Sequence, residues 1–167
     1  MPRPKHMSLK AELEAFLGAS EARRVVLVGI GNPMRHDDVV GLKVLEYLEG
    51  KTSKNVLLLS TETVPESYTG VIRDFRPTHV LLLDAADFKG SPGDGKIIPL
   101  KSITNSSIST HNLPLPALIG YIQNTICPNI ALIGIQVINI EYGEGFSLEV
   151  EKGAKKIANL IHNILIF

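Results

Sequence analysis

The sequence has little cysteine, no excess of charge of either sign and no long apolar run. Its single cysteine, Cys127, excludes an intrachain disulfide and a zinc site built from several cysteines. The 17 basic and 17 acidic residues give a formal net charge of zero, which argues against broad electrostatic binding to nucleic acid. No apolar run approaches the roughly 18 residues that span a membrane. The charged N-terminus lacks the apolar stretch of a secretory signal, so we expect a cytoplasmic protein that neither binds nucleic acid nor inserts into a membrane.

Several motifs that carry common chemistries are also absent. There is neither the Gly-x-Ser-x-Gly turn of serine hydrolases nor the His-Glu-x-x-His helix of zinc proteases. Gly29 and Gly31 follow a predicted strand, but Met34 stands where a dinucleotide-binding fingerprint needs its third glycine, and no Gly-Lys-Ser/Thr triplet follows. Covalent catalysis by serine or cysteine therefore has no support, no phosphate-binding loop is complete, and Cys127 is interpreted as structural.

What the sequence does contain suits a folded α/β domain. With 44% hydrophobic and 20% charged residues in 167, it can bury a core. We expect one domain over residues 1–167, in which residues 1–22 form an N-terminal extension with a short helix. The predicted strands cover about 23–30, 55–61, 79–85, 93–101 and 129–138, and the predicted helices about 8–18, 38–49, 66–75, 115–125 and 146–165.

The predicted strands are continuous apolar runs rather than alternating ones, which indicates that both faces of the sheet are covered. The fold class is therefore an α/β three-layer sandwich with a mostly parallel sheet of about five strands. Too few residues separate Asp84 from Gly93 for a helical crossover. The strand at 93–101 is therefore expected to be antiparallel and to lie at an edge.

Reactive side chains follow the predicted strands at the edge where ligands of open α/β sheets bind. Asp37 and Asp38 come after the first strand, Asp84 ends the third, and His111 precedes a helix. Two carboxylates and one imidazole suit a divalent metal such as zinc or nickel and leave coordination positions open. His36 is a secondary candidate because it lies beside the acids.

Each of these residues also has a plain structural interpretation. Asp37 fits a helix N-cap, Asp84 fits a turn cap, and a lone His111 fits a structural role. An acid after the apolar run "VLLL" is nevertheless costly to bury without compensation. We expect Gly29 and Gly31 to let the backbone approach a bound group, with Asp38 facing a cation.

The motif "GIGNPMRHDDVVG" resembles the opening signature of the hydrogenase maturation endopeptidases. "LLLDAAD" and "STHNLPLPALI" resemble the second and third blocks of that family, "ETVPESY" the segment between the first two, and "ALIGIQV" a later one. The likeness covers roughly residues 23–165 and is nearest to the branch that serves formate-hydrogenlyase and energy-converting hydrogenases. By this resemblance, the metal ligands fall on Asp38, Asp84 and His111.

The resemblance implies an endopeptidase that removes the C-terminal extension of a nickel-iron hydrogenase large-subunit precursor after nickel insertion, cutting just after a basic residue. Its three ligands would recognise the nickel of the precursor, although zinc or another divalent metal is also able to occupy such a site in the isolated protein. Two positions depart from the family. Val39 stands where many relatives have glycine, and Val137 where close relatives tend to have proline.

Two alternatives stay open at the level of the sequence. Peptidyl-tRNA hydrolases carry similar "GNP" turns, but an acid replaces their expected asparagine here, and the chain is not basic. A non-proteolytic nickel or hydrogenase assembly chaperone would use the same fold without cleaving. Loss of the tail from the precursor distinguishes the protease from the chaperone.

Overall fold

The computed structural model describes residues 7–103, 115–127 and 129–166, and in them one five-stranded sheet has the order β2-β1-β3-β5-β4. The first four of these strands are parallel to their neighbours, and β4 pairs with β5 in antiparallel orientation at the edge. Both the fold class and the antiparallel edge strand are therefore confirmed. The bounds are β1 Val25–Ile30, β2 Val56–Glu62, β3 His79–Ala86, β4 Gly95–Ile98 and β5 Ile130–Gln136.

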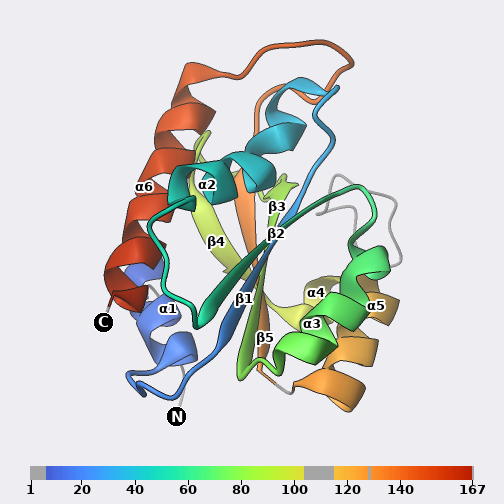
Figure 1. The fold of residues 1–167 in the computed structure, drawn as a ribbon. Helices are drawn as coiled ribbons and strands as arrows, with labels where there is room; N and C mark the ends of the chain where they lie inside the picture. The colour runs from blue at the N-terminus through green and yellow to red at the C-terminus, as the bar shows by residue number, and fades with distance from the viewer. Residues whose placement is uncertain (1–6, 104–114, 128, 167) are drawn as a thin grey trace.

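Helices cover both faces of the sheet, as Figure 1 shows, with α1, α2 and α6 on one side and α3, α4 and α5 on the other. The α-helices are α1 Leu9–Leu17, α2 Val40–Leu48, α3 Thr69–Phe75, α4 Leu100–Ile103, α5 Leu115–Tyr121 and α6 Leu148–Leu165. Short 3-10 turns η1 His36–Val39 and η2 Pro65–Tyr68 precede α2 and α3, and a π-helical turn η3 Ile122–Ile126 extends α5. No helix in the described part of the chain is long and apolar enough to cross a membrane.

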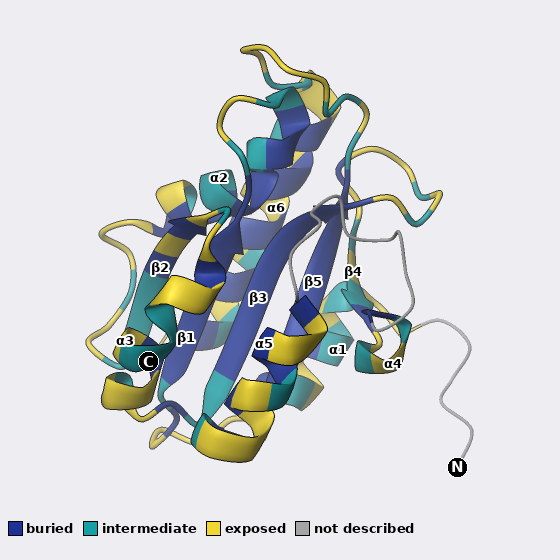
Figure 2. Cartoon of the chain, turned by 90° about the vertical axis from the view of Figure 1, so that its right-hand side faces the viewer, coloured by how far each residue is buried: buried dark blue, intermediate teal, exposed yellow. Residues whose placement is uncertain are grey.

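The buried strands divide the core into two layers. Alternate residues of β3 face opposite sides, so that Leu81 and Leu83 pack with α1, α2 and α6, while Val80 and Leu82 pack with α3 and α5. Figure 2 shows the central strands as buried along most of their length. This two-sided burial is the physical reason why their sequences read as unbroken apolar runs.

The predicted start of the first helix is confirmed by its capping contacts, whereas the predicted end of the fourth strand is not. Ser8 caps α1 by accepting a hydrogen bond from the N–H of Ala11 at 3.2 Å, and Gly18 follows the helix with φ +64°. The prediction that residues 93–101 are all strand is wrong. Pro99 has no N–H for the ladder, and its ring suits the start of a helix, so the strand stops at Ile98 and α4 begins at Leu100.

The parallel strands β1, β2, β3 and β5 all point the same way, so the segments that follow them meet at one end of the sheet. Figure 1 shows the segment after β1 beside the long segment between β5 and α6 at this end. An isolated bridge between Arg35 and Gly143 joins the two. We call this end the carboxyl end of the sheet.

Candidate functional site

Both aspartates of the pair that follows β1 are fully buried in η1. Asp37 does not cap a helix: Arg35 occupies the N-cap position of η1 and Val39 that of α2, neither with a side-chain cap bond. The N-cap interpretation of Asp37 is therefore wrong.

The carboxylate of Asp37 instead binds the segment between β5 and α6. Its Oδ2 accepts hydrogen bonds from the N–H groups of Ile138 and Asn139, both at 3.1 Å, and from the Ser147 hydroxyl at 2.8 Å. Its Oδ1 accepts the N–H of Ser147 at 2.7 Å. Ser147 is the N-cap residue of α6, so the negative charge of Asp37 also lies where the helix dipole favours it. Asp37 thus anchors a distant loop.

Asp38 closes the turn that begins at the glycine pair. Its Oδ2 accepts the N–H of Asn32 at 3.2 Å. A Cβ placed on Gly31 would lie 2.4 Å from the carbonyl oxygen of Asp38, closer than any side chain tolerates. We expected Gly31 to let the backbone approach a bound group, but the group that approaches is the protein's own backbone.

Gly41, in the first turn of α2, also allows a close approach of backbone atoms. Its Cβ would lie 2.3 Å from the carbonyl oxygen of Leu83 and 2.5 Å from that of Ile30. Only glycine lets α2 start directly against the ends of β1 and β3. The preceding turn η1, which holds Asp38, consequently contacts β3.

Asp84 lies near the end of β3 and is buried, with 1% of its surface exposed. In the strand alternation it shares the face of Val80 and Leu82, which α3 and α5 cover. Its register partner on β5 is Gly134. A carboxylate is costly to bury in an apolar sheet face, and such groups are enriched at functional sites. Asp84 is therefore a functional candidate on physical grounds.

The third predicted ligand, His111, lies outside the described residues, so the proposed metal trio stays a prediction. Asp38 and Asp84 lie on two elements in contact at the carboxyl end of the sheet. Within the described ranges, no three His, Cys, Asp or Glu side chains group to hold a metal. Two buried carboxylates fit the oxygen part of a divalent-metal site, which needs a further ligand such as histidine.

His36, the secondary candidate, faces the segment between β5 and α6. Its backbone has φ +45°, and its N–H donates to the carbonyl oxygen of Gly143 at 3.1 Å. A Cβ on Gly143 would lie 2.6 Å from Nε2 of His36, and one on Gly145 would lie 3.1 Å from Nδ1. The two glycines make room for the imidazole ring, which indicates a packing role for His36.

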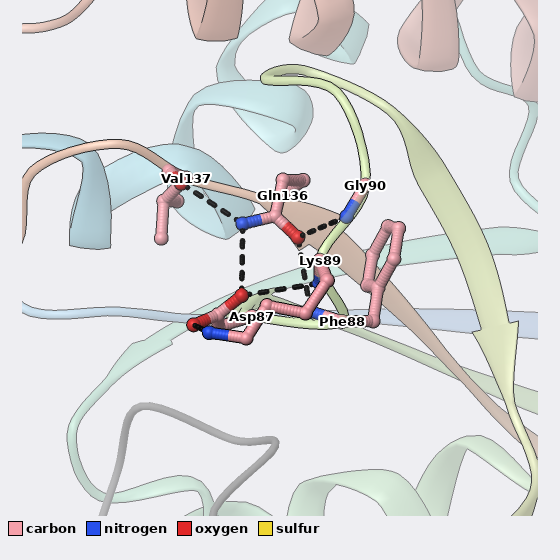
Figure 3. A network of polar contacts seen from close by, with 6 residues as sticks. All are labelled: Asp87, Phe88, Lys89, Gly90, Gln136 and Val137. Carbon is pink, nitrogen blue, oxygen red and sulfur yellow. Dashed lines mark hydrogen bonds and ion pairs between the residues drawn. The ribbon is translucent and has the colours of Figure 1, made fainter.

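Sequence reasoning missed the side chain of Gln136, which ends β5 and is buried (Figure 3). Its Oε1 accepts the N–H groups of Phe88 at 2.9 Å and Gly90 at 3.1 Å. Its Nε2 donates to Oδ1 of Asp87 at 3.3 Å and to the carbonyl oxygen of Val137 at 3.0 Å. The one signal in the sequence was an amide that ends an apolar run. Gln136 fixes the loop that directly follows the strand of Asp84.

Asp87, the second acid of "LLLDAAD", belongs to this network rather than to the buried pair. Lys89 donates to it from both its ammonium group and its N–H, each at 3.1 Å, and lowers the pKa of the carboxyl group, with a smaller contribution from Gln136. Because Asp87 is exposed, it is a weaker metal-ligand candidate than Asp84.

The two departures from the family pattern fit the structure. Val39 has φ −75°, a conformation that valine adopts without strain, so glycine is not required there. Val137 donates its N–H to the carbonyl oxygen of Ala86 at 3.3 Å, a bond that proline is unable to make.

Cys127 lies at the opposite end of the sheet, before β5, and is buried. Its thiol donates to the carbonyl oxygen of Thr78 at 2.9 Å, and burial raises its pKa. A protonated, enclosed thiol is a poor nucleophile. The structural interpretation of Cys127 agrees with this geometry.

The fold and the motifs match known proteins over most of the chain. A profile of the hydrogenase maturation protease family matches residues 42–164. A Methanocaldococcus jannaschii protein assigned as a hydrogenase maturation protease is 34% identical over 151 residues, which cover 86% of this chain and 89% of that protein. The hydrogenase 3 maturation protease of Escherichia coli K12 is 33% identical over 112 residues, which cover 66% of this chain and 71% of that protein.

The agreement extends to solved structures. The crystal structure of the NiFe hydrogenase maturation protease HycI from Thermococcus kodakarensis has a TM-score of 0.82 at 37% identity and covers 92% of this chain and 98% of that chain. The crystal structure of the hydrogenase 3 maturation protease has a TM-score of 0.72 at 25% identity and covers 84% and 90%. The resemblance that the motifs predicted is thus confirmed by profile, sequence and fold, and this chain belongs to the hydrogenase maturation protease family.

Proposed function

We propose that this peptidase removes the C-terminal extension of a nickel-iron hydrogenase large-subunit precursor after nickel has been inserted. The observation that carries the proposal is the burial of Asp38 and Asp84 on contacting elements at the carboxyl end of a sheet with the family fold. Family membership favours this function over a peptidyl-tRNA hydrolase.

Asp38, Asp84 and His111 are proposed to bind the nickel that the precursor itself carries, so that the metal is part of the substrate. Carboxylate oxygens and an imidazole nitrogen suit nickel, and three protein ligands leave positions for groups of the precursor. Recognition of the metal rather than of the tail alone would limit cleavage to precursors that are ready for it.

Binding through these ligands would bring the scissile peptide bond to the carboxyl end of the sheet. A bound divalent metal supplies Lewis acidity and orientation. One of the two carboxylates accepts the proton of an attacking water, whose oxygen adds to the carbonyl carbon. The proton then passes to the leaving amine as the C–N bond breaks, so water is consumed and two chain ends form.

Asp37 and Gln136 would support this chemistry without touching the substrate. Asp37 holds the β5–α6 segment against the turn that carries Asp38. Gln136 holds the loop that follows Asp84. Rigid supports of this kind keep reacting groups in a productive geometry.

The deciding experiment incubates the protein with nickel-loaded and nickel-free precursor and measures the precursor mass. We expect the wild-type protein to shorten only the nickel-loaded form. His111→Ala removes a nitrogen ligand and Asp38→Asn removes a charge at nearly constant shape, and each should abolish or severely slow cleavage.

Matched controls separate this proposal from its rivals. Serine- and cysteine-directed inhibitors should leave cleavage intact, as should Cys127→Ser. Equal cleavage of nickel-free precursor would refute the role of the metal. If wild-type protein binds the nickel-loaded precursor and never shortens it, the assembly-chaperone alternative replaces the protease.

A further inference from the structure

Large apolar side chains are exposed on the segments that follow the parallel strands at the carboxyl end of the sheet. Met34 follows β1 and is 68% exposed, and Val64 follows β2 and is 44% exposed. Ile138 and Tyr142, both after β5, are 56% and 78% exposed. Aromatic and methionine side chains exposed at this level are typical of protein-binding surfaces.

Hydrogen bonds to backbone carbonyl groups hold these three segments together. The N–H of Gly143 donates to the carbonyl oxygen of Met34 at 2.9 Å, and Nε of Arg35 donates to that of Ile140 at 3.0 Å. The N–H of Gly31 donates to the carbonyl oxygen of Glu62 at 2.9 Å, which ties in the segment after β2. The surface is therefore fixed before a partner arrives, which lowers the entropic cost of binding.

The same segments carry four exposed acidic residues, Glu62, Glu66, Glu141 and Glu144. Within the described part of the chain, none of the four forms an ion pair. Arg35, which lies among them, is only partly exposed, and its guanidinium stacks 5.3 Å from the ring centre of Tyr142. We call the four apolar and four acidic residues together the rim; it comprises Met34, Glu62, Val64, Glu66, Ile138, Glu141, Tyr142 and Glu144.

We propose that the rim is the docking surface for the folded body of the large-subunit precursor, and that it recognises a surface patch that carries both apolar and basic side chains. This inference rests on the proposed function, because the rim belongs to the same end of the sheet as Asp38 and Asp84. The acidic groups of the rim select a basic partner and speed its association.

The charge of the rim also argues against a second copy of this chain as the occupant. A two-fold symmetric contact places the same surface on both sides. The four glutamates would then face four glutamates, which disfavours the contact. A basic partner of different sequence is free of this repulsion.

The apolar part of the proposal is tested by steady-state cleavage of nickel-loaded precursor. Met34→Ser combined with Tyr142→Ser should raise KM about tenfold or more, as expected for the loss of large interface side chains, and leave kcat nearly unchanged. Val71→Ser on α3 is the matched control, because Val71 is 47% exposed but lies outside the rim. It should not change KM.

The charged part is tested by Glu141→Lys combined with Glu144→Lys. We expect slower association and a weaker dependence of KM on salt than in the wild-type protein. Glu49→Lys, which reverses an exposed charge at the C-terminal end of α2 and outside the rim, is the control and should behave as wild type.

The outcomes separate this inference from the proposed function. If the wild-type protein cleaves the precursor and the rim variants keep its KM and salt dependence, the docking surface is refuted while the protease stands. If the wild-type protein neither binds nor cleaves the precursor, the proposed function fails and the inference fails with it. If the rim variants change only self-association in analytical ultracentrifugation, a second copy is the occupant and the inference is overturned.

Discussion

At the amino end of the parallel strands, the buried polar side chain of Arg23 forms hydrogen bonds within the fold. At the carboxyl end, three aspartate side chains are buried. Arg23, just before β1, donates to the carbonyl oxygen of Gly18 after α1 and, at 2.6 Å, to that of Ile164 in α6. These bonds tie two helix ends to the sheet. The amino end therefore uses its buried polar groups for cohesion.

The three aspartates at the carboxyl end divide into two kinds. Asp37 is surrounded by four donors of the β5–α6 segment and serves cohesion, as Arg23 does. Asp38 and Asp84 lie on contacting elements, η1 and β3, and are the two carboxylates that we propose as metal ligands. Asp37 is as buried as Asp38, and its four donors are three backbone N–H groups and one hydroxyl of a distant segment, so burial alone does not identify a functional carboxylate.

Replacement of Asp37 should have the largest effect on stability. Asp37→Ala leaves the donors of Ile138, Asn139 and Ser147 without their carboxylate, so we expect the free energy of unfolding to fall by at least about 3 kcal/mol. Urea unfolding measures it. Asp74→Ala removes an exposed acid of α3 and should change stability far less. Similar losses in both variants would contradict the anchoring role of Asp37.

Replacement of Arg23 tests the amino end. Arg23→Met keeps the length of the side chain but leaves the carbonyl groups of Gly18 and Ile164 without their donor. We expect the free energy of unfolding to fall by about 2 kcal/mol, while the cleavage rate per folded molecule stays at the wild-type value. A specific loss of cleavage in a fully folded Arg23 variant would contradict the claim that the buried polar groups of the amino end serve stability alone.

The third prediction concerns pH and His79, the first residue of β3. Burial lowers the pKa of its ring, which packs edge-on against Phe16 at 5.3 Å and lies 2.8 Å from the Thr78 hydroxyl. The unfolded chain, with a histidine pKa of about 6.5, therefore takes up the proton first. The stabilisation is fully present above that pH and is lost as the pH falls through the folded-state pKa.

Unfolding experiments between about pH 8 and pH 5 measure this dependence. His79→Gln should flatten the acid-side decline relative to the wild-type protein, because glutamine does not titrate. His162→Gln, on the last turn of α6, is the control. An unchanged decline in the His79 variant would show that other groups control the acid sensitivity.

The smallest effect is expected at Cys127. Cys127→Ala removes a thiol that donates to the carbonyl oxygen of Thr78, and it leaves a small void in a buried place. We expect a loss of about 1 kcal/mol in the free energy of unfolding and no change in cleavage per folded molecule. A large drop in cleavage would contradict the structural role of this cysteine.

The sequence was sufficient for those parts of the fold that depend on local patterns. Continuous apolar runs marked β1, β3 and β5, and the short spacing after Asp84 predicted the antiparallel edge strand. The prediction failed at Pro99, where a missing N–H outweighed the apolar neighbours and moved the end of β4 to Ile98.

The site was less accessible to sequence reasoning because its supports act over long distances in the chain. The bond between Asp37 and Ser147 joins residues 110 positions apart, and no local pattern distinguishes it from an N-cap. Gly31 is required by the close backbone of η1, and Gly41 by the close backbone of β1 and β3, and both approaches exist only in the folded chain. The roles of Asp38, Asp84 and His111 stay predictions, derived from residue chemistry and from the family motif.

The most direct test is the rate at which the Asp84→Asn variant removes the tail from nickel-loaded precursor, measured by mass and normalised to the folded fraction from circular dichroism. Asparagine keeps the size of the side chain and removes its charge and its capacity to accept a proton. If Asp84 is part of the reacting site, the folded variant should cleave at least about 100-fold more slowly than the wild-type protein. Cleavage at the wild-type rate would contradict the assignment of the carboxyl end as the catalytic end.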